Sequence, residues 1–240
     1  MEKALLAWFD EHARDLPWRR TRDPYAILVS EVMLQQTQVA RVVPRYLAFL
    51  ARWPTVESLA AAAPGDVIRE WQGLGYNRRS LNLHRAARHI AAEGWPDDLT
   101  ELPGVGRYTA DAVARFALDR PVLPVDTNVR RVLDRTGGEF GAASAHALMD
   151  LGATVCLARI PRCDACPLAK DCPSRGRRYE PLRKQSRFEG SFRQRRARTL
   201  TLVAERPRRR SSLDREALES LAADGLVEVR RGLVSLPRAS

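Results

Sequence analysis

Lysine is scarce in this chain of 240 residues, because only Lys3, Lys170 and Lys184 stand among its 40 basic residues. Long apolar runs are missing too, and none approaches the roughly 20 residues that a membrane-spanning helix needs. The first residues lack the pattern of a signal peptide, so we expect a cytoplasmic protein without a membrane segment. Hydrophobic residues make up 45% and charged residues 29% of the chain, which excludes a disordered or collagen-like protein.

Acidic residues are few at one end of the chain. Residues 1–172 hold 22 basic and 21 acidic residues, whereas residues 173–240 hold 18 basic and 8 acidic ones. Nearly all of the net charge of +11 therefore lies in the C-terminal region. A basic segment attracts phosphate backbones and acidic surfaces alike. Charge alone leaves nucleic-acid binding and a merely solvated tail equally open.

Alternating strand patterns are absent before about residue 175, and apolar residues recur there at helical spacing. This pattern predicts an all-α fold. We expect it to occupy residues 1–176, with a basic linker and a small module in residues 177–240.

The C-terminal module has local signals of its own. Ser212 is a candidate N-cap for a helix over residues 213–223. Residues 226–236 are typical of a hairpin whose turn contains Arg230 and Arg231. A helix followed by a basic-tipped hairpin resembles a small winged-helix module, and a simple packing appendage is the alternative.

Cysteine is as scarce as lysine, and all four copies lie within 17 residues, at Cys156, Cys163, Cys166 and Cys172. Disulfides are rare in cytosolic proteins, so four clustered thiols indicate a metal site. Zinc and iron–sulfur clusters both accept four thiolates. Zinc ribbons usually carry two separated Cys-x2-Cys pairs, whereas one compact loop holds all four thiols here. The spacing favours a 4Fe–4S cluster over zinc and over unligated thiols.

A short glycine-containing turn separates two helical segments near the middle of the chain. Gly104 and Gly106 permit backbone angles that are closed to other residues. Their amides, at the start of the next helix, can approach a phosphate group, which a helix N-terminus favours. An ordinary tight turn between helices would use the same residues.

Two carboxylates stand in contrasting surroundings. Asp126 precedes a helical segment, where it is either an N-cap or a functional anion stabilised by the helix dipole. Glu31 interrupts an apolar helical run. If that side chain faces a pocket instead of solvent, desolvation raises its pKa and keeps it protonated near neutral pH. One acid and one anion are the groups that glycosidic cleavage requires.

Together, these motifs resemble the helix–hairpin–helix DNA glycosylases of the endonuclease III and MutY superfamily over residues 5–175. The resemblance implies a two-lobed helical fold in which the four cysteines hold a structural 4Fe–4S cluster. Arg159, Arg162 and Lys170 match the loop residues that approach DNA phosphates in that family. It also implies that Gly104 and Gly106 hold the DNA backbone without reading sequence.

The resemblance assigns roles to further residues. Asp126 matches the family's catalytic aspartate, which stabilises the oxocarbenium-like sugar. Glu31 matches the glutamate that protonates the departing adenine. Members that also cut the backbone carry a lysine at the place of Tyr108, and tyrosine cannot form an imine. We therefore expect a monofunctional glycosylase with little or no lyase activity. Other positions match residues that contact DNA or line the base pocket: Gln35, Gln36, Gln38, Tyr76, Asn128, Arg19 and Asp150.

Two departures from the MutY pattern are visible. Residues 137–141 stand where typical members have about two helices. The region after the cysteines is too short for the C-terminal domain that recognises 8-oxoguanine, and it looks more like the short tail of some actinobacterial relatives. We expect that tail to supply non-specific DNA affinity through its arginines, namely Arg177, Arg178, Arg193, Arg195, Arg196, Arg198, Arg230 and Arg231.

The expected function is therefore base excision repair. We expect a monomeric glycosylase that binds double-stranded DNA with a mismatched or damaged base and removes adenine opposite 8-oxoguanine or guanine. Removal of thymine or uracil opposite guanine is the main alternative. A non-catalytic iron–sulfur DNA-binding protein would not need both Glu31 and Asp126, and an electron-transfer ferredoxin has different cysteine spacing and leaves most of the chain unexplained.

Overall fold

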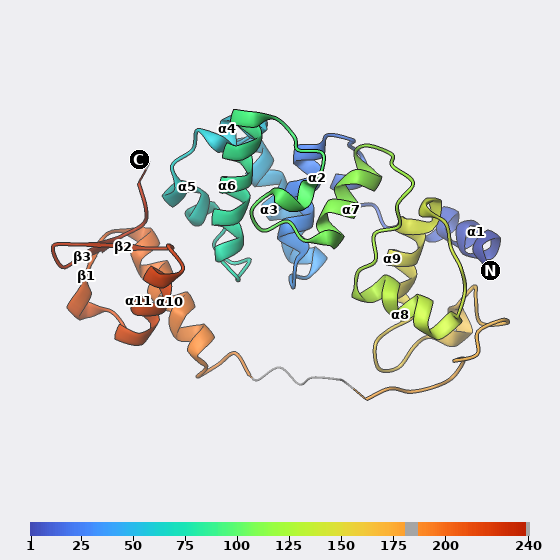
Figure 1. Ribbon diagram of the computed structural model, residues 1–240. Coiled ribbons are helices and arrows are strands. Elements are labelled where there is room, and N and C mark those ends of the chain that lie inside the picture. Colours follow the sequence, from blue (N-terminus) through green and yellow to red (C-terminus); the bar gives the residue numbers. More distant parts are fainter. Residues whose placement is uncertain (181–186, 239–240) are drawn as a thin grey trace. The chain divides into compact units, whose positions relative to one another are not determined.

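The computed structural model describes residues 1–180 and 187–238 (Figure 1). The described chain is mostly helical, as the sequence predicts, with one small sheet near its C-terminal end. Its residues form two compact units. Unit 1 contains described residues 1–27 and 106–180, and unit 2 contains residues 28–105 and 187–238.

Unit 1 is built around the packing of helix α8 (Thr127–Thr136) against helix α9 (Ala145–Thr154), which lie side by side in Figure 1. Its α-helices are α1 (Glu2–His12), α7 (Arg107–Phe116), α8 (Thr127–Thr136) and α9 (Ala145–Thr154). Helices α8 and α9 approach closely at Gly152, where a Cβ atom would lie 2.7 Å from Cβ of Asn128. Residues 137–141, the shortened segment, form no helix.

Unit 2 begins within helix α2 (Pro24–Leu34) and contains four more helices of the N-terminal part of the chain. These are α3 (Val39–Arg52), α4 (Val56–Ala60), α5 (Pro64–Glu70) and α6 (Arg78–Glu93). Helices α4 and α5 both pack against α6. Phe49 and Trp71 are fully buried and meet edge to face, with ring centroids 6.1 Å apart.

The C-terminal module also belongs to unit 2. It consists of α10 (Phe192–Glu205), β1 (Arg208–Arg209), α11 (Arg215–Ala223), β2 (Glu228–Arg230) and β3 (Leu233–Ser235). The strands form an antiparallel sheet in the order β1-β3-β2. The predicted helix and hairpin are present, but Ser212 is not the N-cap. Helix α11 starts two residues later than expected because Asp214 accepts the Ala217 amide at 2.8 Å, while the Ser212 hydroxyl donates to Arg209 O.

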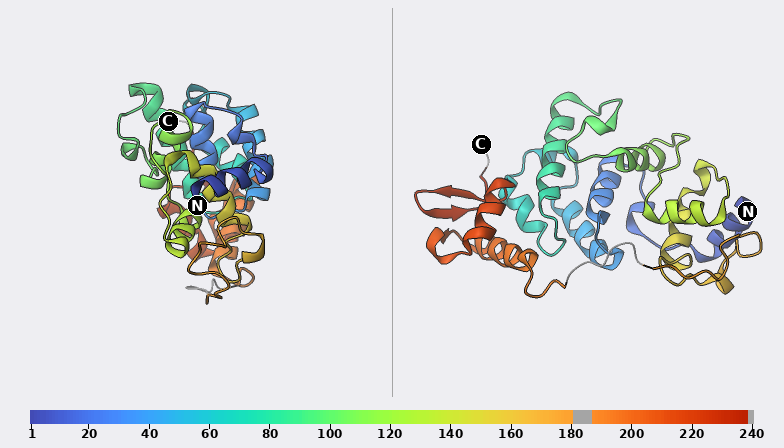
Figure 2. Two further views of the ribbon diagram at one scale, coloured as in Figure 1. Left: turned by 90° about the vertical axis from the view of Figure 1, so that its right-hand side faces the viewer. Right: turned by 60° about the horizontal axis from the view of Figure 1, so that its bottom comes forward.

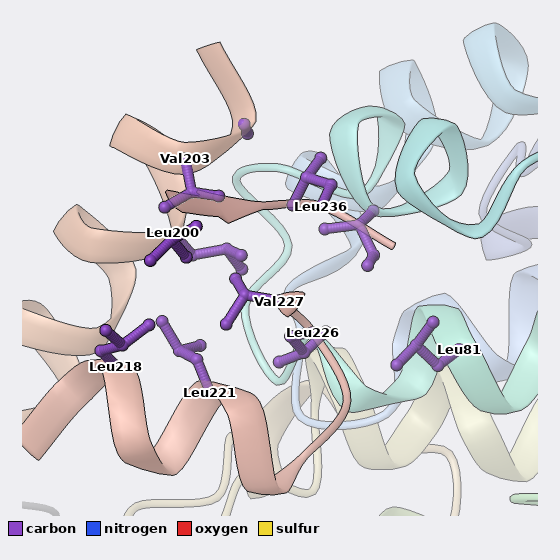
Figure 3. Close-up of a cluster of buried hydrophobic side chains, with 11 residues drawn as sticks. Leu81, Leu200, Val203, Leu218, Leu221, Leu226, Val227 and Leu236 are labelled. Carbon is purple, nitrogen blue, oxygen red and sulfur yellow. The ribbon is translucent and has the colours of Figure 1, made fainter. Parts of the chain in front are cut away.

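The module packs against α5 and α6 through a continuous apolar cluster (Figure 3). Leu200, Leu226 and Val234 are fully buried there, and Ile68 and Leu81 contribute from the earlier helices. Polar contacts support the same junction. The Gly65 amide donates to Pro237 O at 2.9 Å, and Arg69 Nε donates to Ala204 O at 3.0 Å.

Within the described ranges, no helix combines the length and apolar character needed to cross a membrane.

Candidate active site

Glu31 lies on a helix segment that is buried on every side. All residues from Tyr25 to Met33 are buried, and Glu31 itself is only 5% exposed. The solvent-facing interpretation of this glutamate is therefore wrong. Helix α2 is apolar all round, so its single carboxyl group is enclosed by protein.

Arg79 holds the C-terminal end of that helix. Its Nη1 atom donates to Val32 O at 2.6 Å and to Gln35 O at 2.7 Å, while Nη2 donates to Gly75 O at 3.0 Å. Burial lowers the pKa of this guanidinium to about 10. One buried cation thus connects the helix that carries Glu31 with two loops, and it satisfies carbonyls that a helix end leaves open.

Those two loops carry three predicted DNA contacts. Gln36 is exposed with φ of 56°, and Gln35 beside it is half-buried. Tyr76 is 53% exposed with φ of 46°. A tyrosine with more than half of its surface exposed is not a core residue, so the packing interpretation of Tyr76 is wrong. The predicted contact residues are therefore presented at the surface of unit 2.

The glycine-containing turn lies between Leu102 and the start of α7. Gly104 has φ of 80°, and a Cβ atom there would lie 2.7 Å from Cβ of Asn82, so only glycine fits. Gly106 has φ of −92° and is the N-cap of α7. Gly106 therefore does not use the conformational freedom of glycine, because its backbone is extended. Tyr108 is partly buried in the first turn of the same helix.

Asp126 is the N-cap of α8, and the capping interpretation is confirmed. Its Oδ1 atom accepts the amides of Asn128 at 2.8 Å and Val129 at 2.7 Å, and Oδ2 accepts Nδ2 of Asn128 at 3.0 Å. These contacts fix the carboxylate at the positive end of the helix. Capping and a functional role are compatible, since the side chain remains partly exposed.

Arg131 extends this arrangement to the cysteine loop. Its Nη2 atom donates to Asn128 Oδ1 at 2.7 Å and to Gly152 O at 2.6 Å, and Nε donates to Cys156 O at 2.7 Å. Burial lowers the pKa of Arg131. Both ends of the Asn128 side chain are occupied by Asp126 and Arg131, so this residue, predicted to contact DNA, holds Asp126 in place.

The four cysteines line one cavity of unit 1, with Arg135 at its wall. All four are partly buried free thiols, and burial together with the neighbouring thiols raises the pKa of Cys166. Within the described residues, no three or more histidine, cysteine or acidic side chains are gathered closely enough to hold a metal ion. By residue type and number, and by their shared cavity, the thiols still fit a group with four thiolate ligands.

Hydrogen bonds to and around the sulfurs support this fit. The Gly176 amide donates to Sγ of Cys163 at 3.2 Å, and Arg135 Nη1 lies 3.5 Å from Sγ of Cys156. Arg135 also donates to the carbonyls of Leu157 and Ala158 at 2.7 Å. Donors aimed at sulfur stabilise negative charge on thiolates.

Arg19 and Asp150 meet in a buried ion pair of unit 1. Arg19 donates from Nη1 and Nη2 to the two carboxylate oxygens at 2.9 and 2.7 Å, and the Arg14 amide and Nε add two further bonds. Burial opposes the charge on Asp150, but these hydrogen bonds outweigh it and hold its pKa below the ordinary value. The structure thus places two predicted pocket residues in contact with each other.

A cavity of about 190 Å³ adjoins this pair, lined in part by Trp18, Arg19 and Arg115. His146 also lines it and stacks on Phe116, with ring centroids 4.2 Å apart. Burial, reinforced by the positive charge of Arg19, lowers the pKa of His146 to about 4. This histidine is neutral at physiological pH.

Several of these residues were not predicted from the sequence. Arg131 and Arg135 are four positions apart on α8, a spacing that places them on one helix face and was available as a signal. Arg14, Arg79 and His146 gave no such signal, because each has partners in a distant segment, such as Asp150, Val32 and Phe116.

Comparisons with known proteins identify the family to which the chain belongs. Residues 29–152 match the model of the HhH-GPD superfamily of base excision DNA repair proteins. The chain is also 43% identical over 270 residues to a protein named adenine DNA glycosylase from Mycolicibacterium smegmatis, covering 93% of this chain and 91% of the relative.

This chain belongs to the HhH-GPD superfamily. An adenine DNA glycosylase of Homo sapiens is 40% identical over 213 residues, covering 72% of this chain and 39% of the human protein. Among solved structures, a thermostable thymine-DNA glycosylase superposes with a TM-score of 0.65 at 27% identity, covering 71% of this chain and 93% of that one. An endonuclease III–DNA covalent intermediate superposes with a TM-score of 0.62 at 23% identity, covering 71% and 92%, and shares the fold. The predicted family and helical fold are confirmed.

Proposed function

We propose that this superfamily member is a monofunctional DNA glycosylase that removes adenine paired with 8-oxoguanine or guanine. The observation that carries the proposal is the 43% identity to a mycobacterial adenine DNA glycosylase across 91% of that relative. The match covers 93% of this chain and therefore includes most of the module. The buried Glu31 and the helix-capping Asp126 are the two carboxyl groups that the reaction needs.

In this proposal the two carboxyl groups have separate tasks. Glu31 is buried on an otherwise apolar helix, and burial favours the protonated form of a carboxyl group, which can then donate a proton to the departing base. Asp126 is held by two amides and by Asn128, so that its charge faces the cationic sugar as the base leaves. Fixing that charge beforehand avoids reorganisation during the reaction.

DNA contacts are assigned to three surfaces. Gly104 and Gly106 approach the phosphate backbone beside α7, while Gln35, Gln36 and the exposed ring of Tyr76 occupy the space around the flipped base. Flipping costs a few kcal/mol, which such contacts must offset. Arg19 and Asp150 form one wall of the base pocket as a fixed ion pair. We assign the protein to the cytoplasm, where it acts as a monomer.

Cys156, Cys163, Cys166 and Cys172 would hold a 4Fe–4S cluster. When bound, the cluster is structural, since four ligands fix the loop over residues 156–172 that Arg131 and Arg135 tie to α8. The basic side chains of that loop, including Arg159 and Arg162, are then held in one arrangement for contact with phosphates.

Removal of thymine or uracil opposite guanine is the second candidate. It is favoured by the superposition on a thymine-DNA glycosylase and by Tyr108, which is not a lysine. A panel of duplexes with adenine, thymine, uracil or hypoxanthine opposite guanine and 8-oxoguanine separates the two. We expect the fastest single-turnover release for adenine opposite 8-oxoguanine. Faster release of thymine or uracil would establish the second candidate instead.

A further inference from the structure

A basic groove lies on the C-terminal module, between the turn that precedes α11 and the turn that joins β2 to β3. Its volume is about 730 Å³. The hairpin that forms one wall projects from the module in Figure 2. Four exposed arginines, one hydroxyl and an apolar side chain are among its lining residues, namely Arg209, Arg210, Arg215, Arg231, Ser211 and Leu233.

The ion pairs of the module show which of its arginines have no carboxylate partner and can bind a ligand. Its six carboxylates between residues 191 and 238 all pair with arginines, and the partners include Arg195, Arg196, Arg208, Arg215 and Arg230. Arg195 and Arg196, expected to contact DNA, instead join α10 to α11. Within the described residues, Arg209 and Arg231 have no carboxylate partner, and both line the groove.

The hairpin turn supports the same conclusion. Arg231 has φ of 49° and Gly232 has φ of 77°, so both take left-handed angles. Asparagine or glycine adopts that conformation more readily than arginine. The backbone conformation of the turn therefore does not explain why arginine stands at position 231. The Arg210 amide donates to Gly232 O at 2.9 Å and fixes the turn against the opposite wall.

The groove is firmly attached to unit 2. Leu226 and Leu236 of the module are buried in one apolar cluster with Ile68 of α5 and Leu81 of α6 (Figure 3). At Gly65 a Cβ atom would lie 2.6 Å from Pro237 O, so the two segments meet without space for a side chain. A ligand held in the groove is therefore held by the same compact unit that carries Glu31 and Tyr76.

We propose that this groove binds the phosphate backbone of duplex DNA, independently of sequence, which rests on the proposed glycosylase function. Guanidinium groups donate in the fork geometry that phosphate oxygens accept. The match to the mycobacterial adenine DNA glycosylase covers 93% of this chain, so most of the module is shared with a DNA repair enzyme.

The chain offers a closely matched pair of double variants. Arg209→Gln with Arg231→Asn removes the two groove charges, and the asparagine suits the left-handed turn. Arg230 was expected to contact DNA, but it pairs with Glu228, as Arg208 pairs with Glu205, and neither arginine lines the groove. Arg208→Gln with Arg230→Gln therefore removes two charges from neighbouring positions outside the groove. Both variants lose the same net charge, so a difference between them reports position and not overall attraction.

The measurement is fluorescence anisotropy with a short undamaged duplex over a range of salt concentrations. The slope of log K against log salt should fall by about two units in the groove variant, since each phosphate contact contributes roughly 0.9. The control variant should keep the wild-type slope, and lysine at both groove positions should retain it as well. Single-turnover base removal at saturating enzyme should be unchanged in the control variant.

Equal slopes for the groove and control variants would overturn the proposal, as would loss of the slope in the double lysine variant. If the groove binds an acidic protein segment instead of DNA, the groove variant will keep the wild-type slope of log K against log salt. Melting temperatures confirm that each variant folds. Because the probe is undamaged, the test does not depend on base removal, and failure of the glycosylase assignment would appear only in the release assay.

Discussion

Arg131 donates from Nη2 to Oδ1 of Asn128 at 2.7 Å, and its Nε atom donates at the same distance to Cys156 O. One half-buried guanidinium therefore joins the residue that holds Asp126 to the first cysteine of the loop. The connection runs entirely within unit 1. It gives the cysteine loop a physical route by which its order affects the candidate catalytic carboxylate.

Replacing Arg131 should weaken base removal without removing any group that touches the substrate. We expect Arg131→Gln to lower the single-turnover rate roughly ten- to a hundredfold, the range found when partners that orient a ligand are lost. Arg130→Gln, an exposed neighbour on the same helix, serves as the control. An unchanged rate in the Arg131 variant, measured at saturating enzyme, would contradict the connection.

The metal content tests the assignment of the four thiols. Protein purified anaerobically should be brown, absorb near ~400 nm and contain about four iron atoms per chain, as thiolate-ligated 4Fe–4S clusters do. Removal of the iron by a chelator should unfold the loop and abolish DNA cleavage after alkali. A colourless protein with one zinc ion would show that the cysteine spacing was misinterpreted.

Tyr108 predicts the form of the product. Because a phenol cannot form an imine, borohydride should trap no covalent complex, and the abasic strand should break only after alkali treatment. A Tyr108→Lys variant provides an amine at the same position for comparison. Efficient trapping of the wild-type protein would overturn the monofunctional assignment.

His146 should make the fold sensitive to acid. Its pKa is about 4 in the folded chain against 6.5 for an unperturbed histidine, so between these values the unfolded chain binds a proton that the folded chain does not. Acidification from about pH 7 to about pH 5 should therefore cost roughly 2 kcal/mol of stability through this group.

The melting temperature of His146→Gln should consequently fall less than that of the wild-type protein over the same pH step. The exposed His12→Gln variant is the control and should behave like the wild type. Equal losses in the His146 variant and the wild type would show that this ring does not limit stability in acid.

Local patterns predicted much of the fold. Helical periodicity predicted the helices of residues 1–175, and the turn at Arg230–Arg231 predicted the hairpin, because these signals lie within a few neighbouring residues. The attachment of the module to α5 and α6 was not predictable in this way. It depends on Leu200 and Leu226 meeting Ile68 and Leu81, which are more than a hundred positions earlier in the chain.

The same difference between local signals and long-range contacts applies to the candidate site. The sequence indicated Glu31, Asp126 and the four cysteines as residue types in a recognisable order. It could not show that Arg79 donates to carbonyls of two loops, or that Arg14 joins Arg19 on Asp150, because those contacts exist only after folding. The contacts of these supporting arginines are therefore the part of the site that only the folded structure shows.

The central claim is that Asp126 and Glu31 together remove adenine. The most direct measurement is single-turnover release of adenine opposite 8-oxoguanine by the wild type, Asp126→Asn and Glu31→Gln, with duplex affinity measured in parallel. The account predicts release by the wild type and near-complete loss in both variants with affinity retained, because each group acts on the transition state. Near-normal release by either variant would contradict it.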